Sequence, residues 1–178
     1  MLHFIKTGNY ECVPQMLARY PLLTPLDFHV HAYLVSNKYG IALLQDRALN
    51  AYLNAAAYEI RAGLVILRGG QDPDREGPLP EGIEGKPIMP PIDCFLNSLV
   101  LLWKHTHDRS DSMRRAVLEI IKRNLNELLR VPFFFTLMTT MVAFGDDVVA
   151  SLEDDGFDVK PFQIPTGGRL KHVLWFDS

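Results

Sequence analysis

Two pairs of histidines are the first candidates for chemistry in this sequence. His29 and His31 form one His-x-His pair, and His105 and His107 form another. Neutral imidazole is a common metal ligand. On a helix, however, residues i and i+2 point about 200° apart and do not easily chelate one ion. No third ligand at helical spacing accompanies either pair, so we expect no metal or cofactor, and we expect His31 to be a partly buried, hydrogen-bonded side chain.

Acidic residues form two further clusters, Asp146-Asp147 and Glu153-Asp154-Asp155. Paired carboxylates can carry out acid/base chemistry or bind a divalent cation. These clusters lie beside expected helix ends and turns, where aspartate is favoured for capping and solvation alone. The sequence also contains no GxSxG, P-loop or GxGxxG motif. We therefore expect no catalytic residues and a protein that is not an enzyme.

A basic surface is expected on the helix that follows Ser112. Its cations are Arg114, Arg115, Lys122, Arg123 and Arg130, and its anions are Glu119 and Glu127. Such a surface could contact phosphates or an acidic partner, but Glu119 can pair with a cation one turn on, which favours an ordinary solvated face. With a net charge of -3 and a pI near 6.0, nucleic acid is a poor partner for this chain.

Composition indicates a globular protein. The 178 residues are 48% hydrophobic and 22% charged, enough for one core of ordinary size or two small lobes. Cys12 and Cys94 are far apart and outside any CxxC spacing, which favours a reducing compartment. The N-terminus lacks a secretory signal, and the apolar segment 131–144 is shorter than the roughly 20 residues that span a bilayer. We expect a cytoplasmic or nuclear protein without a membrane segment.

The elements that would position these residues begin with a helical hairpin. Apolar spacing predicts a helix from Asp27 to Tyr39 with Phe28, Ala32, Val35 and Tyr39 on one face. Val30 and Leu34 lie on nearly the opposite face, so we expect this helix to pack on both sides. Gly40 can adopt the left-handed conformation that ends a helix. A second helix is predicted from about Ala42 to Ala62 and would pack against the first.

The remainder of the chain is expected to contain a linker, further helices and a β-hairpin. Glycine, proline and charge dominate the linker. Helices are predicted from Asp93 to near His105, from Met113 to Arg130 and from Phe133 to Phe144, closing at Gly145. Partial alternation in "FDVKPFQI" and "RLKHVLWF" predicts the C-terminal β-hairpin. The predicted organisation is residues 1–67, linker 68–92, helical extension 93–155 and tail 156–178, in a mainly α fold.

Parts of the sequence resemble the BTB/POZ family, and fungal members most closely. "MLHFIKTGNYE" resembles a segment of the BTB domain that precedes a helical hairpin, and "VHAYLVSNKYGIALLQDRAL" resembles that hairpin. "VLLWKHTHDRSDSMRRAVLEII" is similar to the helices that follow the domain. The resemblance covers about residues 1 to 60 and 93 to 152. Ser36-Asn37 stands where the family usually has Ala-Asp, and the strands that open a complete BTB domain have no counterpart before Met1, so a BTB/POZ-like region without the N-terminal sheet is expected.

The resemblance implies a protein–protein interaction module, either a degenerate or a truncated adaptor. A protein partner is expected, with cullin-3 and a second copy of the chain as the partners that the family suggests. We assign the interaction surface to Tyr33, Lys38 and Tyr39 in the hairpin and to Arg114, Arg115 and Arg123 in the later helix. The alternative is a small ligand-binding or metal-binding protein, or an enzyme, that uses His29, His31 and nearby acidic residues.

Overall fold

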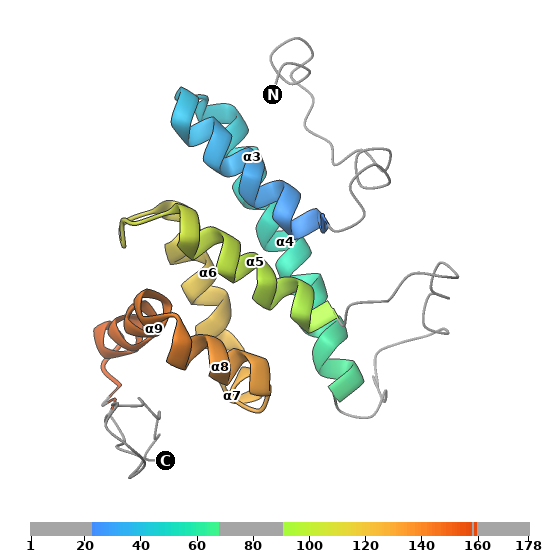
Figure 1. Cartoon of the computed structure of the whole chain (residues 1–178), viewed down its shortest axis with the longest axis vertical. Helices are drawn as coiled ribbons and strands as arrows, with labels where there is room; N and C mark the ends of the chain where they lie inside the picture. The colour runs from blue at the N-terminus through green and yellow to red at the C-terminus, as the bar shows by residue number, and fades with distance from the viewer. Residues whose placement is uncertain (1–22, 68–90, 158, 160–178) are drawn as a thin grey trace. The chain divides into compact units, whose positions relative to one another are not determined.

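Helices make up almost all of the described part of the chain (Figure 1). The computed structural model describes residues 23–67, 91–157 and 159. Its helices are α3 (Pro25–Tyr39), α4 (Ala42–Leu67), α5 (Pro91–His105), α6 (Ser112–Arg123), α7 (Leu125–Leu128), α8 (Pro132–Thr140) and α9 (Val142–Asp154). The described ranges contain no strand, so the prediction of a mainly α fold is confirmed for them. The predicted C-terminal β-hairpin and most of the predicted linker lie outside the described residues.

The chain divides into two compact units, Met1–Leu101 and Leu102–Ser178. The first contains α3, α4 and most of α5. The second contains the last turn of α5 and all of α6 to α9. The boundary falls within α5 and does not coincide with the edges of the linker; the four-part organisation expected from the sequence stays a prediction.

Helix α3 of the α3–α4 hairpin is capped at both ends. Thr24 and Asp27 make a reciprocal capping box in which the Thr24 hydroxyl oxygen accepts from the Asp27 backbone N–H at 3.1 Å. At the other end Gly40 has φ 65°, and the backbone N–H of Ile41 donates to the Ser36 carbonyl at 2.9 Å. The predicted bend at Gly40 is therefore confirmed, whereas the helix begins at Pro25 rather than at Asp27, with Thr24 as its N-cap.

Of the two apolar faces predicted for α3, the one that carries Val30 is the more deeply buried in unit 1. Leu26, Val30 and Tyr33 are completely or almost completely buried. Phe28, Ala32 and Val35 are only partly buried, and Tyr39 is exposed. The prediction that α3 packs on both apolar faces is therefore confirmed for the face that carries Val30 and wrong for the end of the other face at Tyr39. Both faces of α3 carry apolar side chains, and the residues of α4 that pack against α3 determine which face is fully buried. Those fully or nearly fully buried residues are Leu44, Ala48, Tyr52, Ala56 and Ile60, spaced by four along the helix.

Within unit 1, α5 packs closely on α4. A Cβ atom on Gly63 would lie 2.8 Å from Cβ of Ile92, so only glycine permits this approach without a shift. Deeper in the unit, the Tyr52 hydroxyl lies 2.7 Å from Oγ of Ser98. Ser98 uses its own proton to donate to the Phe95 carbonyl at 2.6 Å. The Tyr52 hydroxyl is therefore the donor to Ser98, and burial raises the pKa of Tyr52.

Changing Ser98 should destabilise unit 1 more than changing Tyr52. The variant Ser98→Ala removes the acceptor of a fully buried hydroxyl, which costs about 1 to 3 kcal/mol. The variant Tyr52→Phe removes the donor and leaves Ser98 bonded to Phe95, at a cost of about 0.5 to 1.5 kcal/mol. Urea denaturation of both variants measures the two costs. The double variant should be less destabilised than the sum of the single variants, and an additive result would contradict the hydrogen bond.

Unit 2 contains two helix breaks that the sequence did not reveal. The predicted helix from Met113 to Arg130 is interrupted at Asn124, whose side-chain amide donates to the Ile120 carbonyl at 2.8 Å. The helix expected to end at Phe144 breaks instead at Met141, and Gly145 lies inside α9. A Cβ on Gly145 would come 2.5 Å from the Met138 carbonyl oxygen. Glycine at this position thus allows α9 to approach the backbone of α8, and the predicted helix end at Gly145 was wrong.

No single helix among the described residues is long and apolar enough to cross a membrane. Helices α8 and α9 reach the required length and apolar content only when taken together, and the chain bends by 101° between them.

Candidate functional site

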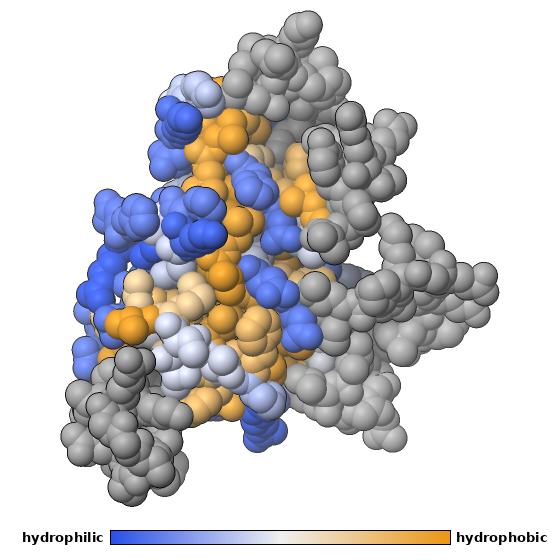
Figure 2. Space-filling view, viewed as in Figure 1, coloured by the Kyte–Doolittle hydropathy of each residue, from blue (hydrophilic) through white to orange (hydrophobic). Residues whose placement is uncertain are grey.

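The bend of the α3–α4 hairpin presents large side chains to solvent. Tyr39 is 58% exposed and Leu43 is 57% exposed, although both are large and apolar. Lys38, also exposed, places its Nζ atom 5.7 Å from the centre of the Tyr39 ring, within the range of a cation–π interaction. We call Lys38, Tyr39 and Leu43 the bend surface. Figure 2 shows hydrophobic side chains reaching the surface among hydrophilic ones in the region of α3 and α4.

Tyr33 does not belong to this surface. Its side chain is completely buried because it lies two turns before the bend on the face of α3 that packs against α4. The assignment of Tyr33 to an interaction surface was wrong for this fold. Lys38 and Tyr39 are exposed as that assignment requires, and their role in binding stays a prediction.

The histidines and carboxylates of the alternative hypothesis are not gathered into one site. His29 is buried, whereas His31 is exposed rather than partly buried as expected. Asp27 is used in the capping box, where its carboxylate accepts from the Thr24 backbone N–H at 3.0 Å. His105 and His107 are both exposed. Within ranges 23–67 and 91–157, no group of three or more His, Cys, Asp or Glu side chains is placed to hold a metal ion.

His29 should make the stability of the protein depend on pH. Burial lowers the pKa of His29 below its ordinary value of 6.5. In the interval between the lowered pKa and 6.5, the unfolded chain binds a proton that the folded chain does not, so stability should fall as the pH drops through this interval. The slope from one group is at most about 1.4 kcal/mol per pH unit.

Urea denaturation between about pH 5 and 8 measures this dependence. The variant His29→Gln should lose this part of the pH dependence, while His31→Gln, at an exposed position, should keep it. If His29→Gln kept the pH dependence of the wild type, protonation of the buried His29 imidazole would not be its cause, and the prediction would be contradicted.

In unit 2, Arg114 is the centre of a buried polar network. The residue is only 3% exposed, and its guanidinium donates from Nη1 to Asp147 Oδ2 at 2.8 Å and from Nε to Thr106 Oγ1 at 2.7 Å. Its Nη2 atom donates to the carbonyls of Trp103 and Thr106. The assignment of Arg114 to an exposed interaction surface was therefore wrong. A charge at this depth is tolerated because these partners satisfy its donors.

The Asp147 carboxylate is paired with N–H groups of three other residues. Besides Arg114, the Trp103 indole N–H donates to Asp147 Oδ2 at 2.9 Å, and Arg109 Nε lies 2.7 Å from Oδ1. The Trp103 ring also packs edge-on against Phe144, with ring centres 4.9 Å apart. Among the described residues, no buried side-chain nitrogen or oxygen lacks a hydrogen-bond partner. This network joins the end of α5, the start of α6 and the first half of α9 within unit 2.

The sequence contained a signal for this network. Arg114 shares its helix face with Val117, Leu118 and Ile121, at the i, i+3, i+4 and i+7 positions of an inward stripe. Asp147 lies between the buried residues Phe144 and Val148 in the same way. Two opposite charges on two apolar faces indicate a buried ion pair.

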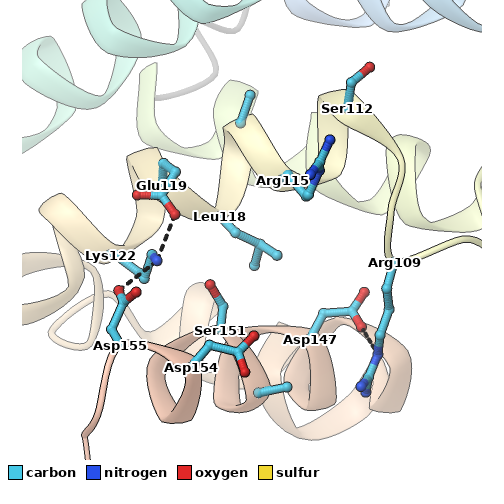
Figure 3. Close-up of a pocket in the computed structure, with 12 residues that line it drawn as sticks. Arg109, Ser112, Arg115, Leu118, Glu119, Lys122, Asp147, Ser151, Asp154 and Asp155 are labelled. Carbon is cyan, nitrogen blue, oxygen red and sulfur yellow. Dashed lines mark hydrogen bonds and ion pairs between the residues drawn. The ribbon is translucent and has the colours of Figure 1, made fainter.

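Beside the network, α6 and α9 enclose an open groove of about 530 Å³. Figure 3 shows Arg109, Ser112 and Arg115 at one end and Glu119, Lys122 and Asp155 at the other. The Lys122 Nζ atom lies 2.6 Å from carboxylate oxygens of both Glu119 and Asp155. Desolvation tends to lower the pKa of Lys122, but these two hydrogen bonds outweigh it and raise the pKa.

Exposed arginines define the surface assigned to α6. Arg115 and Arg123 are both exposed, and Arg115 lines the groove whereas Arg123 does not. Their exposure agrees with the assignment, and their binding role stays a prediction.

No protein-family model, no curated protein and no solved structure matches this chain.

Proposed function

We propose that this chain is a non-enzymatic protein–protein interaction module of the BTB/POZ-like type, acting as an adaptor, and that the bend surface contacts the partner protein. The exposure of Tyr39 and Leu43 on either side of the bend is the observation that carries the proposal. Single exposed apolar residues are common on protein surfaces. Here two of them lie four positions apart at a rigid helix junction, next to a cation.

The physical reason is the gain from covering these side chains. Burial of apolar surface yields about 25 cal/mol per Å², and tyrosine is enriched among the residues that dominate binding energy at protein interfaces. Because Gly40 and the Ile41 hydrogen bond fix the end of α3, the bend is already ordered. Binding a partner there loses less conformational entropy than ordering a flexible loop.

The resemblance to BTB/POZ proteins supports the same class of function. The hairpin and the later helices α5 and α6 fall in the two resembling ranges of the sequence. Ser36, which replaces the usual alanine, is fully buried and donates its hydroxyl to the Tyr33 carbonyl at 2.6 Å. A serine is thus accommodated within the helix without an unpaired polar group. Cullin-3, a second copy of the chain, and a cytoplasmic or nuclear location belong to this proposal as what the family suggests.

Affinity purification of the full-length tagged chain from a fungal extract tests the proposal. We expect a protein to be retained in stoichiometric amount and to be lost when Tyr39→Glu is used as bait. Metal analysis and mass spectrometry of the same purified chain are the opposing measurement. A stoichiometric metal ion or small molecule, with no protein retained, would contradict the proposal and favour a ligand-binding protein.

A further inference from the structure

The groove between α6 and α9 carries opposite charge at its two ends. The two helices run in the same direction, because Arg114 in the first turn of α6 pairs with Asp147 in the first half of α9, and Lys122 in the last turn of α6 pairs with Asp155 just after α9. The basic end therefore lies near the beginning of both helices. The acidic end lies near their last turns.

At the basic end, the two arginines have N–H donors that are not used in ion pairs. Arg109 is 64% exposed and uses its Nε atom for Asp147, while both oxygens of Asp147 are already bonded within the network. Arg115 is exposed and forms no ion pair with any other described residue. Two guanidinium groups at one end of a groove are suited to binding a carboxylate, since arginine presents several N–H donors in a planar array.

At the acidic end, carboxylates outnumber cations. Glu119, Asp154 and Asp155 line it, and Lys122 is the one cation among the groove residues there. Lys122 binds Glu119 and Asp155; Asp154 is exposed and has no ion pair within the described ranges. Each carboxylate can accept several hydrogen bonds, so this end is suited to an ammonium or guanidinium group.

The length of the groove favours an occupant in an extended conformation. From Arg115 to Lys122 the groove follows seven residues of helix, about 10 Å. A helical occupant needs about seven residues between its two charged side chains to cover this distance. An extended chain in the polyproline II conformation rises about 3.1 Å per residue and brings every third side chain to the same face, so it covers about this distance in three residues.

We propose that the α6–α9 groove binds an extended peptide segment of a partner protein that carries an acidic and a basic side chain three residues apart. The acidic side chain binds Arg109 and Arg115, and the basic side chain binds at Asp154 and Asp155. Small side chains of Ala116, Ala150 and Ser151 between the two ends leave room for the peptide backbone. This surface is distinct from the bend surface, so the proposal goes beyond the proposed function and does not depend on it.

Fluorescence anisotropy with three labelled peptides tests this proposal on the full chain. The peptides contain Glu-Ala-Ala-Lys, Lys-Ala-Ala-Lys or Glu-Ala-Ala-Glu between glycines. The mixed peptide should bind about two- to fivefold more tightly than either of the others, because each exposed ion pair contributes only modestly. Binding should weaken at about 1 M salt. Equal or tighter binding of the doubly basic peptide would show simple attraction to a negatively charged chain and would overturn the proposal, as would absence of binding by all three.

Charge reversal at each end provides the second test. Arg115→Glu cancels the positive charge of the basic end and should remove the preference for the mixed peptide over the doubly basic one. Asp154→Lys cancels the negative charge of the acidic end and should remove the preference for the mixed peptide over the doubly acidic one. Both residues are exposed, so the folded state should persist, and circular dichroism checks this. An unchanged order of peptide affinities in either folded variant would overturn the proposal. Tyr39→Glu should leave all three peptide affinities unchanged, which separates this groove from the bend surface.

Discussion

Replacing Arg114 with methionine should lower the free energy of unfolding by about 3 to 5 kcal/mol, the usual cost of removing one partner of a buried ion pair. Methionine fills a similar volume but donates no hydrogen bonds. Asp147 would then keep the exposed Arg109 and the Trp103 indole as donors, and Thr106 would lose its guanidinium partner. The penalty arises because a carboxylate that is almost fully buried loses its closest buried cation.

Arg115→Met is the matched control, because it makes the same change one residue along the same helix at an exposed site. Surface substitutions of this kind usually change stability by about 0.5 kcal/mol or less. Urea denaturation of the two variants and the wild type measures the difference. Similar stabilities for Arg114→Met and Arg115→Met would contradict the buried network.

The second large effect is expected at the bend surface. Tyr39→Glu places a charge where the proposal has an aromatic ring covered by a partner. Loss of a dominant interface residue costs about 2 kcal/mol or more, which corresponds to roughly a 30-fold increase in Kd. The exposed side chain of Tyr39 contributes little to the fold, so the stability of the chain should change by less than about 0.5 kcal/mol.

Tyr58→Glu is the control for this prediction. Tyr58 is 65% exposed on α4, and it lies about 22 Å from Leu43 along the helix axis. The same substitution there should leave the Kd for the partner recovered in the affinity purification unchanged. A similar loss of affinity in both variants would mean that added negative charge, rather than the bend, weakens binding.

The hairpin could be predicted because its determinants are local. Gly40 adopts the left-handed conformation for which glycine is suited, and the apolar residues on either side of it have helical spacing. The packing face of α3 could not be predicted in the same way, because apolar side chains occur on both faces and the choice depends on α4. The breaks at Asn124 and Met141 depend on side-chain and backbone contacts with no glycine or proline at the break.

The errors in the candidate site have a related cause. Arg114 was assigned to the surface because a charged residue is rarely buried without a partner, and its partner Asp147 lies 33 positions away in the sequence. Tyr33 falls in the same family-like hairpin segment as Lys38 and Tyr39, but a difference of five or six positions moves a residue to another helix face. Exposure of Lys38, Arg115 and Arg123 agrees with their positions away from the buried stripes, whereas Tyr39 is exposed although its spacing places it on an apolar face.

Photo-crosslinking at the bend tests the central claim most directly. A photoreactive phenylalanine derivative placed at position 39 of the full chain should form an adduct with one protein of the fungal extract. The same derivative at position 58 should not form that adduct. An absence of any protein adduct at position 39, or equal adducts at both positions, would contradict a partner-binding role for the bend of the α3–α4 hairpin.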